Sequence, residues 1–150
     1  MASKGQLTGM RGVYLVAAEL SRLGFIVSPT SRSAAGADLL VTDHNCKKAF
    51  SVQVKTNAVK RSWFTMSKRS RKIKSPSHIY VLVNLGPKAV EYYIVPSKVV
   101  AERIKRTEFV RIRFGMASDA KKSIVTRING NFSVGRCKNV RRLSRFAAPR

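Results

Sequence analysis

The chain has 150 residues, which suits one domain with a hydrophobic core and is too short for two domains of ordinary size. A hydrophobic content of 44% excludes a wholly disordered chain, because disordered chains lack the apolar residues that offset the entropy of ordering. Thirty Lys and Arg against seven Asp and Glu give a net charge of +23, which favours a nucleic-acid partner over an anionic membrane or an acidic protein.

The apolar stretches are far shorter than the roughly 20 residues of a membrane-spanning helix. The first residues contain no apolar core of a signal peptide, so we expect a cytoplasmic protein without a membrane partner. Cys46 and Cys137 have no metal-binding spacing and cannot form a disulfide framework. We interpret both as reduced thiols.

The first predicted element is an amphipathic helix over Met10–Leu23. Its apolar residues recur at helical spacing, and Gly24 follows as the signal for its C-terminal end. Glu19 lies within this helix. Phe25–Ser28 predicts a short strand, and the small polar residues after Pro29 predict a loop.

Two strands joined by a tight turn follow. Ala37–Asp43 has a buried Leu-Leu-Val centre, and Asp43-His44-Asn45 is typical of a hairpin turn, in which Asp43 serves as a turn residue. The second strand, Ala49–Asn57, alternates cleanly between apolar and polar residues. Phe50, Val52 and Val54 therefore share one face, and Ser51, Gln53 and Lys55 share the other.

The next segments predict a short extended piece at Trp63–Met66 and a basic loop or short helix at Lys68–Lys74. The aromatic pair Trp63-Phe64 belongs to the core or a dimer contact, with stacking on nucleobases as the alternative. His78–Leu85 and Ala89–Val95 flank Gly-Pro and predict a pair of strands, the first of them central.

The end of the chain predicts a helix from Ser97, as its N-cap, to about Lys105. A strand follows at Phe109–Phe114, and the last residues form a basic tail that we expect to order with a partner. His44 and His78 lack ligands at metal spacing, and we interpret both as structural.

The hairpin brings three polar residues with complementary chemistry together. Asp38 opens one strand, and Gln53 and Lys55 lie two apart on one face of its neighbour. A carboxylate here, with Glu19 available from a packed helix, suits a hard divalent cation that prefers oxygen ligands. A lysine beside it can orient water or stabilise developing charge, which is the chemistry of phosphodiester hydrolysis.

These residues resemble a known family. Gly36-Ala37-Asp38, the hairpin and Gln53-Val54-Lys55 resemble the PD-(D/E)XK nuclease superfamily, and Tyr92–Ser97 adds a likeness to its small prokaryotic endonuclease and Holliday-junction-resolvase-like domains. The resemblance implies an α/β, restriction-endonuclease-like αβββαβ core, a mixed central sheet flanked by helices, over residues 1–106. Residues 107–150 would form a basic C-terminal extension packed on or continuing the same domain.

The same resemblance assigns roles. Asp38 would be the principal metal ligand, Lys55 the catalytic lysine, and Glu19 would complete the metal shell. Gln53 would occupy the variable acid or amide position, and the backbone carbonyl of Val54 would be a further ligand for Mg²⁺ or Mn²⁺. Ala37 stands where the family usually has Pro, and Gln53 stands where it usually has Glu, which removes one negative charge from the site.

We therefore expect a metal-dependent endonuclease that hydrolyses DNA, duplex or branched, without a small-molecule cofactor. A homodimer is implied by the resemblance to junction-resolving enzymes. Two alternatives stay open, a catalytically inactive nucleic-acid-binding module of the same fold and a basic RNA-binding protein. The expected nucleic-acid contacts are basic or polar residues in loops and in the tail: Arg32, Ser33, Lys60, Arg61, Lys68, Arg69, Arg71, Lys72, Lys74, Arg136, Arg141, Arg142 and Arg145.

Overall fold

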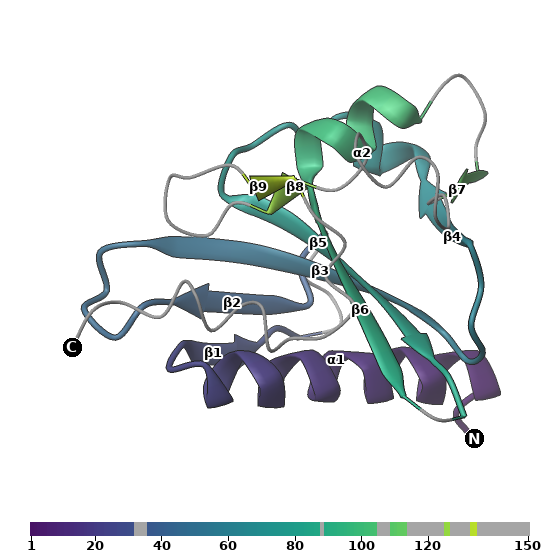
Figure 1. Ribbon diagram of the computed structural model, residues 1–150, viewed down its shortest axis with the longest axis horizontal. Coiled ribbons are helices and arrows are strands. Elements are labelled where there is room, and N and C mark those ends of the chain that lie inside the picture. Colours follow the sequence, from purple (N-terminus) through teal and green to yellow (C-terminus); the bar gives the residue numbers. More distant parts are fainter. Residues whose placement is uncertain (32–35, 88, 105–108, 114–124, 127–132, 135–150) are drawn as a thin grey trace.

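A five-stranded mixed sheet forms the centre of the molecule, in the order β1-β2-β3-β5-β6 (Figure 1). The computed structural model describes residues 1–31, 36–87 and 89–104, and the strand segments 109–113, 125–126 and 133–134. Only β3 and β5 run parallel among the neighbouring strands of this sheet. The strands are β1 (Ile26–Pro29), β2 (Leu39–Thr42), β3 (Ala49–Asn57), β5 (His78–Leu85) and β6 (Val90–Pro96).

The first helix, α1 (Lys4–Arg22), begins well before the predicted Met10. A capping box starts it, because the Gln6 N–H donates to Ser3 Oγ at 3.2 Å and the Ser3 N–H donates to Gln6 Oε1 at 2.8 Å. The helix ends before Gly24, whose φ of +87° suits a glycine after a helix C-terminus. The sequence therefore predicted the end of the helix correctly and missed its first turns.

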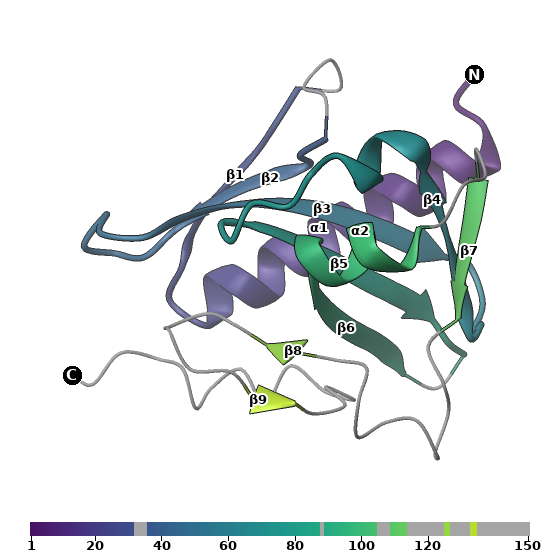
Figure 2. The ribbon, with the colours of Figure 1, turned by 90° about the horizontal axis from the view of Figure 1, so that it is seen from above.

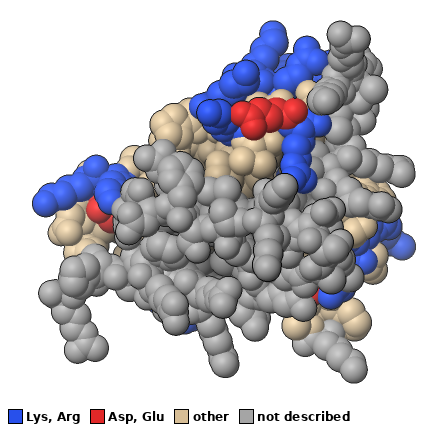
Figure 3. All heavy atoms as spheres, turned by 45° about the horizontal axis from the view of Figure 1, so that its top comes forward, with Lys and Arg blue, Asp and Glu red and all other residues tan. Residues whose placement is uncertain are grey.

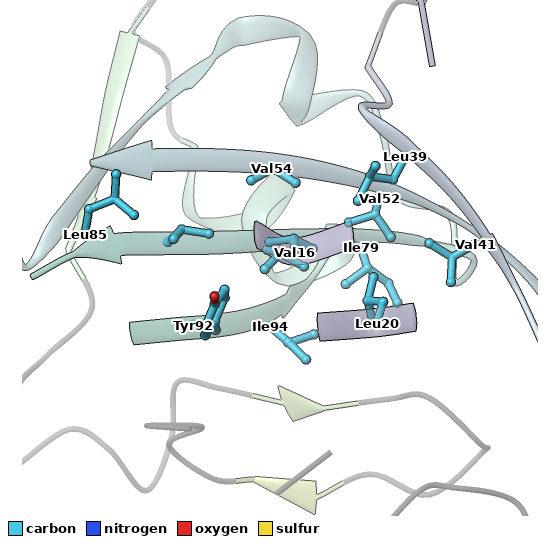
Figure 4. Packing of buried hydrophobic residues seen from close by; sticks show 12 residues of the cluster. Val16, Leu20, Leu39, Val41, Val52, Val54, Ile79, Leu85, Tyr92 and Ile94 are labelled. Atoms are coloured by element: carbon cyan, nitrogen blue, oxygen red, sulfur yellow. The ribbon is translucent and has the colours of Figure 1, made fainter. Parts of the chain in front are cut away.

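The two faces of the sheet are covered by different helices (Figures 1 and 2). On one face, Val16 and Leu20 of α1 pack in a buried cluster with Val52 and Val54 of β3 (Figure 4). On the other face, a second cluster joins residues of β5 to the second helix, α2 (Ser97–Arg103). Its buried members are Phe64, Met66, Tyr80, Leu82, Tyr93, Val95, Val100 and Ile104.

The connection between β3 and β5 differs from the expected order of elements. An αβββαβ core would carry a helix after the third strand, whereas the structure has a strand, β4 (Trp63–Ser67), and a short 3₁₀ helix, η1 (Lys68–Arg71). This segment has no apolar residues repeating at 3.6-residue spacing, so it cannot build an amphipathic helix. The second helix comes after β6 instead.

The start of α2 corrects a second expectation. Ser97 is the first residue of α2 and Pro96 is its N-cap, so the predicted capping role of Ser97 is wrong. The Ser97 hydroxyl instead donates to the carbonyl of Ser75 at 2.6 Å, and Ser97 is fully buried. This hydrogen bond fastens the loop before β5 to the start of α2.

Among the described residues, three short strands follow α2. The first, β7 (Phe109–Arg113), pairs antiparallel with β4, and β8 (Val125–Thr126) pairs with β9 (Ser133–Val134). The expected boundary near residue 107 stays a prediction, because residues 105–108 and much of the following chain lie outside the described residues. Neither helix in the described ranges is long and apolar enough to cross a membrane.

Candidate active site

Asp38 is held at the start of β2 by two hydrogen bonds to β3. Its main-chain N–H donates to the carbonyl of Val52 at 2.8 Å, and its Oδ2 accepts the N–H of Val54 at 2.7 Å. The carboxylate thus occupies the place that a backbone carbonyl of β2 would take if the ladder continued. Because its contacts are to residues 52 and 54, Asp38 lies beside Gln53.

Gln53 and Lys55 share the sheet face that carries Asp38. Val52 and Val54 are buried against α1, and side chains alternate along a strand, so Gln53 and Lys55 point to the opposite face. Leu39 is also buried against α1, which directs the adjacent Asp38 away from that helix. Asp38, Gln53 and Lys55 are each half-buried, and solvent can reach them.

Glu19 is not brought to these three residues. It belongs to α1, on the far face of the sheet, where its carboxylate accepts the Arg22 Nε–H in an ion pair at 2.9 Å. Burial and the charge of Glu19 raise the pKa of Tyr92, which lies in the α1-side cluster. The expected metal role of Glu19 thus has no support in its position, and its carboxylate is paired with a basic residue of the same helix.

Two further polar residues adjoin the site: Ser51, which the sequence placed on the face of Gln53 and Lys55, and His78, which we interpreted as structural. His78 opens β5 opposite Ser51, and its Nδ1 lies 2.8 Å from Ser51 Oγ. His78 is buried, and its ring meets that of Tyr80 edge to face with centroids 5.1 Å apart. Burial lowers the pKa of His78 while the charge of Asp38 opposes that change, which places His78 in the field of Asp38. The alternation of apolar and polar residues along β3 indicated the position of Ser51. The apolar residues that follow His78 in the sequence gave no signal that it lies near the site.

A polar network lies at the other end of the same face. The Asn84 side-chain amide donates to the carbonyl of Arg61 at 2.8 Å, and the Asn57 amide donates to Asn84 Oδ1 at 3.1 Å. Lys60 donates to a carboxylate oxygen of Glu91 at 2.6 Å. The network fastens the β3–β4 connection to the sheet just beyond Lys55.

The charge of Glu91 depends on this network. Burial raises the pKa of Glu91, but its hydrogen bonds with Lys60 and Tyr93 outweigh that effect and hold the pKa below its usual value. The expected nucleic-acid contact Lys60 thus has an acidic partner. Arg61 is the other expected nucleic-acid contact in the β3–β4 connection. Its guanidinium lies over the ring of Trp63, 4.9 Å from the ring centroid.

The remaining expected contacts that the structure describes gather near α2. All of the basic side chains from η1 to Lys74 are exposed. Because η1 packs against α2, the exposed Lys98 and Arg103 of α2 belong to the same basic surface. Lys and Arg side chains gather over this part of the molecule (Figure 3). We call this set the η1–α2 basic surface: Lys68, Arg69, Arg71, Lys72, Lys74, Lys98 and Arg103. The other expected contacts, Arg32, Ser33, Arg136, Arg141, Arg142 and Arg145, lie outside the described residues.

The donor set around Asp38 fits a hard cation that keeps part of its water shell. Across the described ranges, no three His, Cys, Asp or Glu side chains gather as a metal site by themselves. In an extended strand the N–H and C=O of one residue point to the same neighbour, so the Val54 carbonyl faces the same edge as its N–H to Asp38. A carboxylate, a backbone carbonyl and the Gln53 amide supply oxygen ligands of the kind that Mg²⁺ accepts alongside water.

Comparisons with known proteins show the fold. No family model matches the chain, and no curated protein matches its sequence. The structure is similar to that of a bacterial homing endonuclease, I-Ssp6803I, with a TM-score of 0.51 and 17% identity over 79% of this chain and 80% of that chain. It is also similar to Hjc, a Holliday junction resolvase from the archaeal hyperthermophile Archaeoglobus fulgidus, with a TM-score of 0.49 and 14% identity over 70% and 83% of the two chains.

The likeness to the homing endonuclease extends over most of both chains. The chain therefore has a restriction-endonuclease-like fold.

Proposed function

We propose that the protein is a metal-dependent nuclease that hydrolyses DNA phosphodiester bonds at Asp38, Gln53 and Lys55. The observation that carries the proposal is the hydrogen bond from the Val54 N–H to the Asp38 carboxylate at 2.7 Å. It fixes a charged oxygen group beside Gln53 and Lys55, at a place on the sheet that solvent can reach. The homing endonuclease with this fold cleaves nucleic acid by name, and the +23 charge suits a polyanionic substrate.

The roles follow from what each group can donate or accept. Asp38, the Val54 carbonyl and the Gln53 amide would hold Mg²⁺ or Mn²⁺, which when bound polarises a phosphodiester oxygen and acidifies water. The Lys55 ammonium donates hydrogen bonds, so it orients the attacking water and stabilises negative charge that develops on the phosphate. The η1–α2 basic surface lies on the same side of the sheet, where it binds neighbouring phosphates.

Glu19 is left out of this proposal. Its carboxylate is on the α1 side with Arg22, and α1 packs on the Val52 and Val54 face of β3. Replacing Glu19 by Gln should therefore leave cleavage close to the wild-type rate. A loss as large as that of an Asp38 variant would return Glu19 to the metal shell.

The experiment is a substrate panel of linear duplex, branched and single-stranded DNA with Mg²⁺, Mn²⁺ or neither. Wild type should cut at least one substrate only with a divalent metal, and Lys55→Ala should bind that substrate with similar affinity and cut it at least ~100-fold more slowly. Equal traces of cleavage in wild type and Lys55→Ala would identify a contaminating nuclease and end the proposal. The panel also selects the DNA structure, and gel filtration with and without DNA tests the homodimer.

A second candidate is a nucleic-acid-binding module that has kept the fold without the reaction. The observations that favour it are the uncharged Gln53 and the placement of Glu19, which leave Asp38 as the carboxylate beside Lys55 in the described chain. This module would bind DNA with strong salt dependence and would give no heat of binding with Mg²⁺ or Mn²⁺ in calorimetry. A preference for structured RNA over every DNA in the panel would instead identify the basic RNA-binding protein.

A further inference from the structure

The hairpin that joins β2 and β3 projects beyond both helices (Figures 1 and 2). We call residues 43–48 the β2–β3 tip. The last pair between the two strands is Thr42 with Ala49, and the neighbouring strands stop here too, since β5 begins opposite Ser51 and β1 begins opposite Thr42. The tip is thus a six-residue turn beyond the last strand pair, with no strand beside it among the described residues.

Hydrogen bonds within the turn fix the shape of the tip. Asp43 Oδ1 accepts the N–H of Lys47 at 2.8 Å and the N–H of Lys48 at 3.2 Å. The Cys46 N–H donates to the Asp43 carbonyl at 2.9 Å, and Thr42 Oγ1 donates to the Lys48 carbonyl at 2.9 Å. The negative charge of Asp43 is used to hold the turn, so the tip presents a preformed shape to a partner.

The side chains at the end of the tip are exposed and carry hydrogen-bonding groups. His44, Asn45 and Lys47 are exposed, and a group of basic side chains stands apart from the η1–α2 basic surface at the hairpin (Figure 3). An asparagine amide matches the hydrogen-bonding edge of adenine, and a lysine ammonium matches that of guanine. This set of groups differs from the lysines and arginines of η1, which suit phosphates.

The dimensions of the tip fit a groove of B-form DNA. The major groove is about 12 Å wide and about 8.5 Å deep and admits a two-stranded β-ribbon, so it has room for the turn that joins two strands. From Gln53 back to Lys48 is five residues of chain, at most about 17 Å, which corresponds to no more than about five phosphates at about 3.4 Å of helix axis each. The tip and the candidate active site can therefore contact one duplex together.

We propose that the β2–β3 tip enters the major groove of DNA and reads base edges within about five base pairs of the phosphate at Asp38. The inference rests on the proposed function for the position of the cut, and it gives that site a sequence preference. A-form RNA is excluded as the partner of the tip, because its major groove is too narrow for side chains to read.

The test uses the full chain and a duplex library with randomised bases. Bound DNA is selected in Ca²⁺ and sequenced, and in parallel the ends made by cleavage in Mg²⁺ are mapped. Wild type should enrich specific bases at one or two positions, and Asn45→Ala and Lys47→Ala should each lose that enrichment by about tenfold, the worth of one base contact. Both variants should fold normally, since the hydrogen bonds of the turn use the side chains of Asp43 and Thr42 and main-chain groups.

Lys98→Ala is the matched control, because it also removes one exposed positive charge and lies on α2. It should weaken binding equally for all sequences and keep the base preference. The proposal fails if wild type enriches no bases, if Asn45→Ala and Lys47→Ala keep the enrichment, or if an RNA duplex competes as well as DNA. Selection by binding still reads the preference when no DNA is cut, so failure of the nuclease proposal is distinguished from failure of this one.

Discussion

Replacing Asp38 by Asn separates its structural role from its proposed chemical role. The amide oxygen that Asp38→Asn introduces can still accept the Val54 N–H, but the negative charge is gone. A hydrogen bond to a charged acceptor contributes about 1.5–3 kcal/mol and a neutral one about 0.5–1.5 kcal/mol, so Asp38→Asn should cost about 1 kcal/mol of unfolding free energy. Cleavage with Mg²⁺ should nevertheless fall by at least ~100-fold, because the metal loses its charged ligand.

Asp38→Ala is the comparison variant, because it removes the acceptor altogether. It leaves the partly buried N–H of Val54 without this acceptor and should lower the free energy of unfolding by about 1–3 kcal/mol. For a protein of this size, each kcal/mol lowers Tm by about 2–4 °C. Nicking of supercoiled DNA and thermal unfolding, measured on the same samples, give both quantities. Wild-type cleavage by Asp38→Asn, in a protein that unfolds like wild type, would refute the assignment of Asp38.

Three further predictions concern packing, charge and pH. Gly12→Ala should lower the free energy of unfolding by about 1–3 kcal/mol, because an added Cβ would overlap Thr56 of β3. Gly9→Ala is the control: its added Cβ meets nothing within 4 Å, so it should raise the free energy of unfolding by about 0.5–1 kcal/mol, and urea unfolding measures both. Gln53→Glu adds a charge beside the metal ligands and should lower the Mg²⁺ concentration for half-maximal cleavage about fivefold, equal to about 1 kcal/mol; an unchanged metal titration would place residue 53 outside the metal shell. Burial lowers the pKa of His78 below its ordinary 6.5, so the unfolded chain binds the proton more readily and the free energy of unfolding falls as the pH drops below about 6.5. In His78→Gln, the free energy of unfolding should fall less between about pH 8 and pH 5 than in wild type. An equal fall would mean that another group causes it.

The hairpin was predictable because two independent signals agreed on it. Alternation along Ala49–Asn57 identified the faces, and the Asp43 turn fixed the connection, and both are present in the structure. The first turns of α1 were missed because they depend on a local capping box and contribute little to the buried face. The role of Ser97 was missed because its partner, the Ser75 carbonyl, is 22 residues away in the sequence.

The position of Glu19 shows that a helical repeat in the sequence does not by itself predict which face of the sheet the helix covers. A helical repeat places Glu19 near the border of the apolar stripe of α1, but it does not say which face of the sheet the helix covers. The packing of β3 decides this: an apolar helix face must lie on the face of Val52 and Val54, and that leaves Gln53 and Lys55 on the side away from α1. Combining the two patterns, instead of reading each alone, would have separated Glu19 from the other three residues.

Asp38 is the residue whose position folding alone explains least. The Val54 N–H needs an acceptor at the point where β2 begins, and a backbone carbonyl, a serine or an asparagine would satisfy it without burying part of a charge. The sequence instead places a carboxylate there, in a chain with only seven acidic residues, and surrounds it with half-buried Gln53 and Lys55. A charge that the ladder does not require, held at a fixed place on a face that solvent can reach, is expected where a cation or a reacting phosphate must be bound.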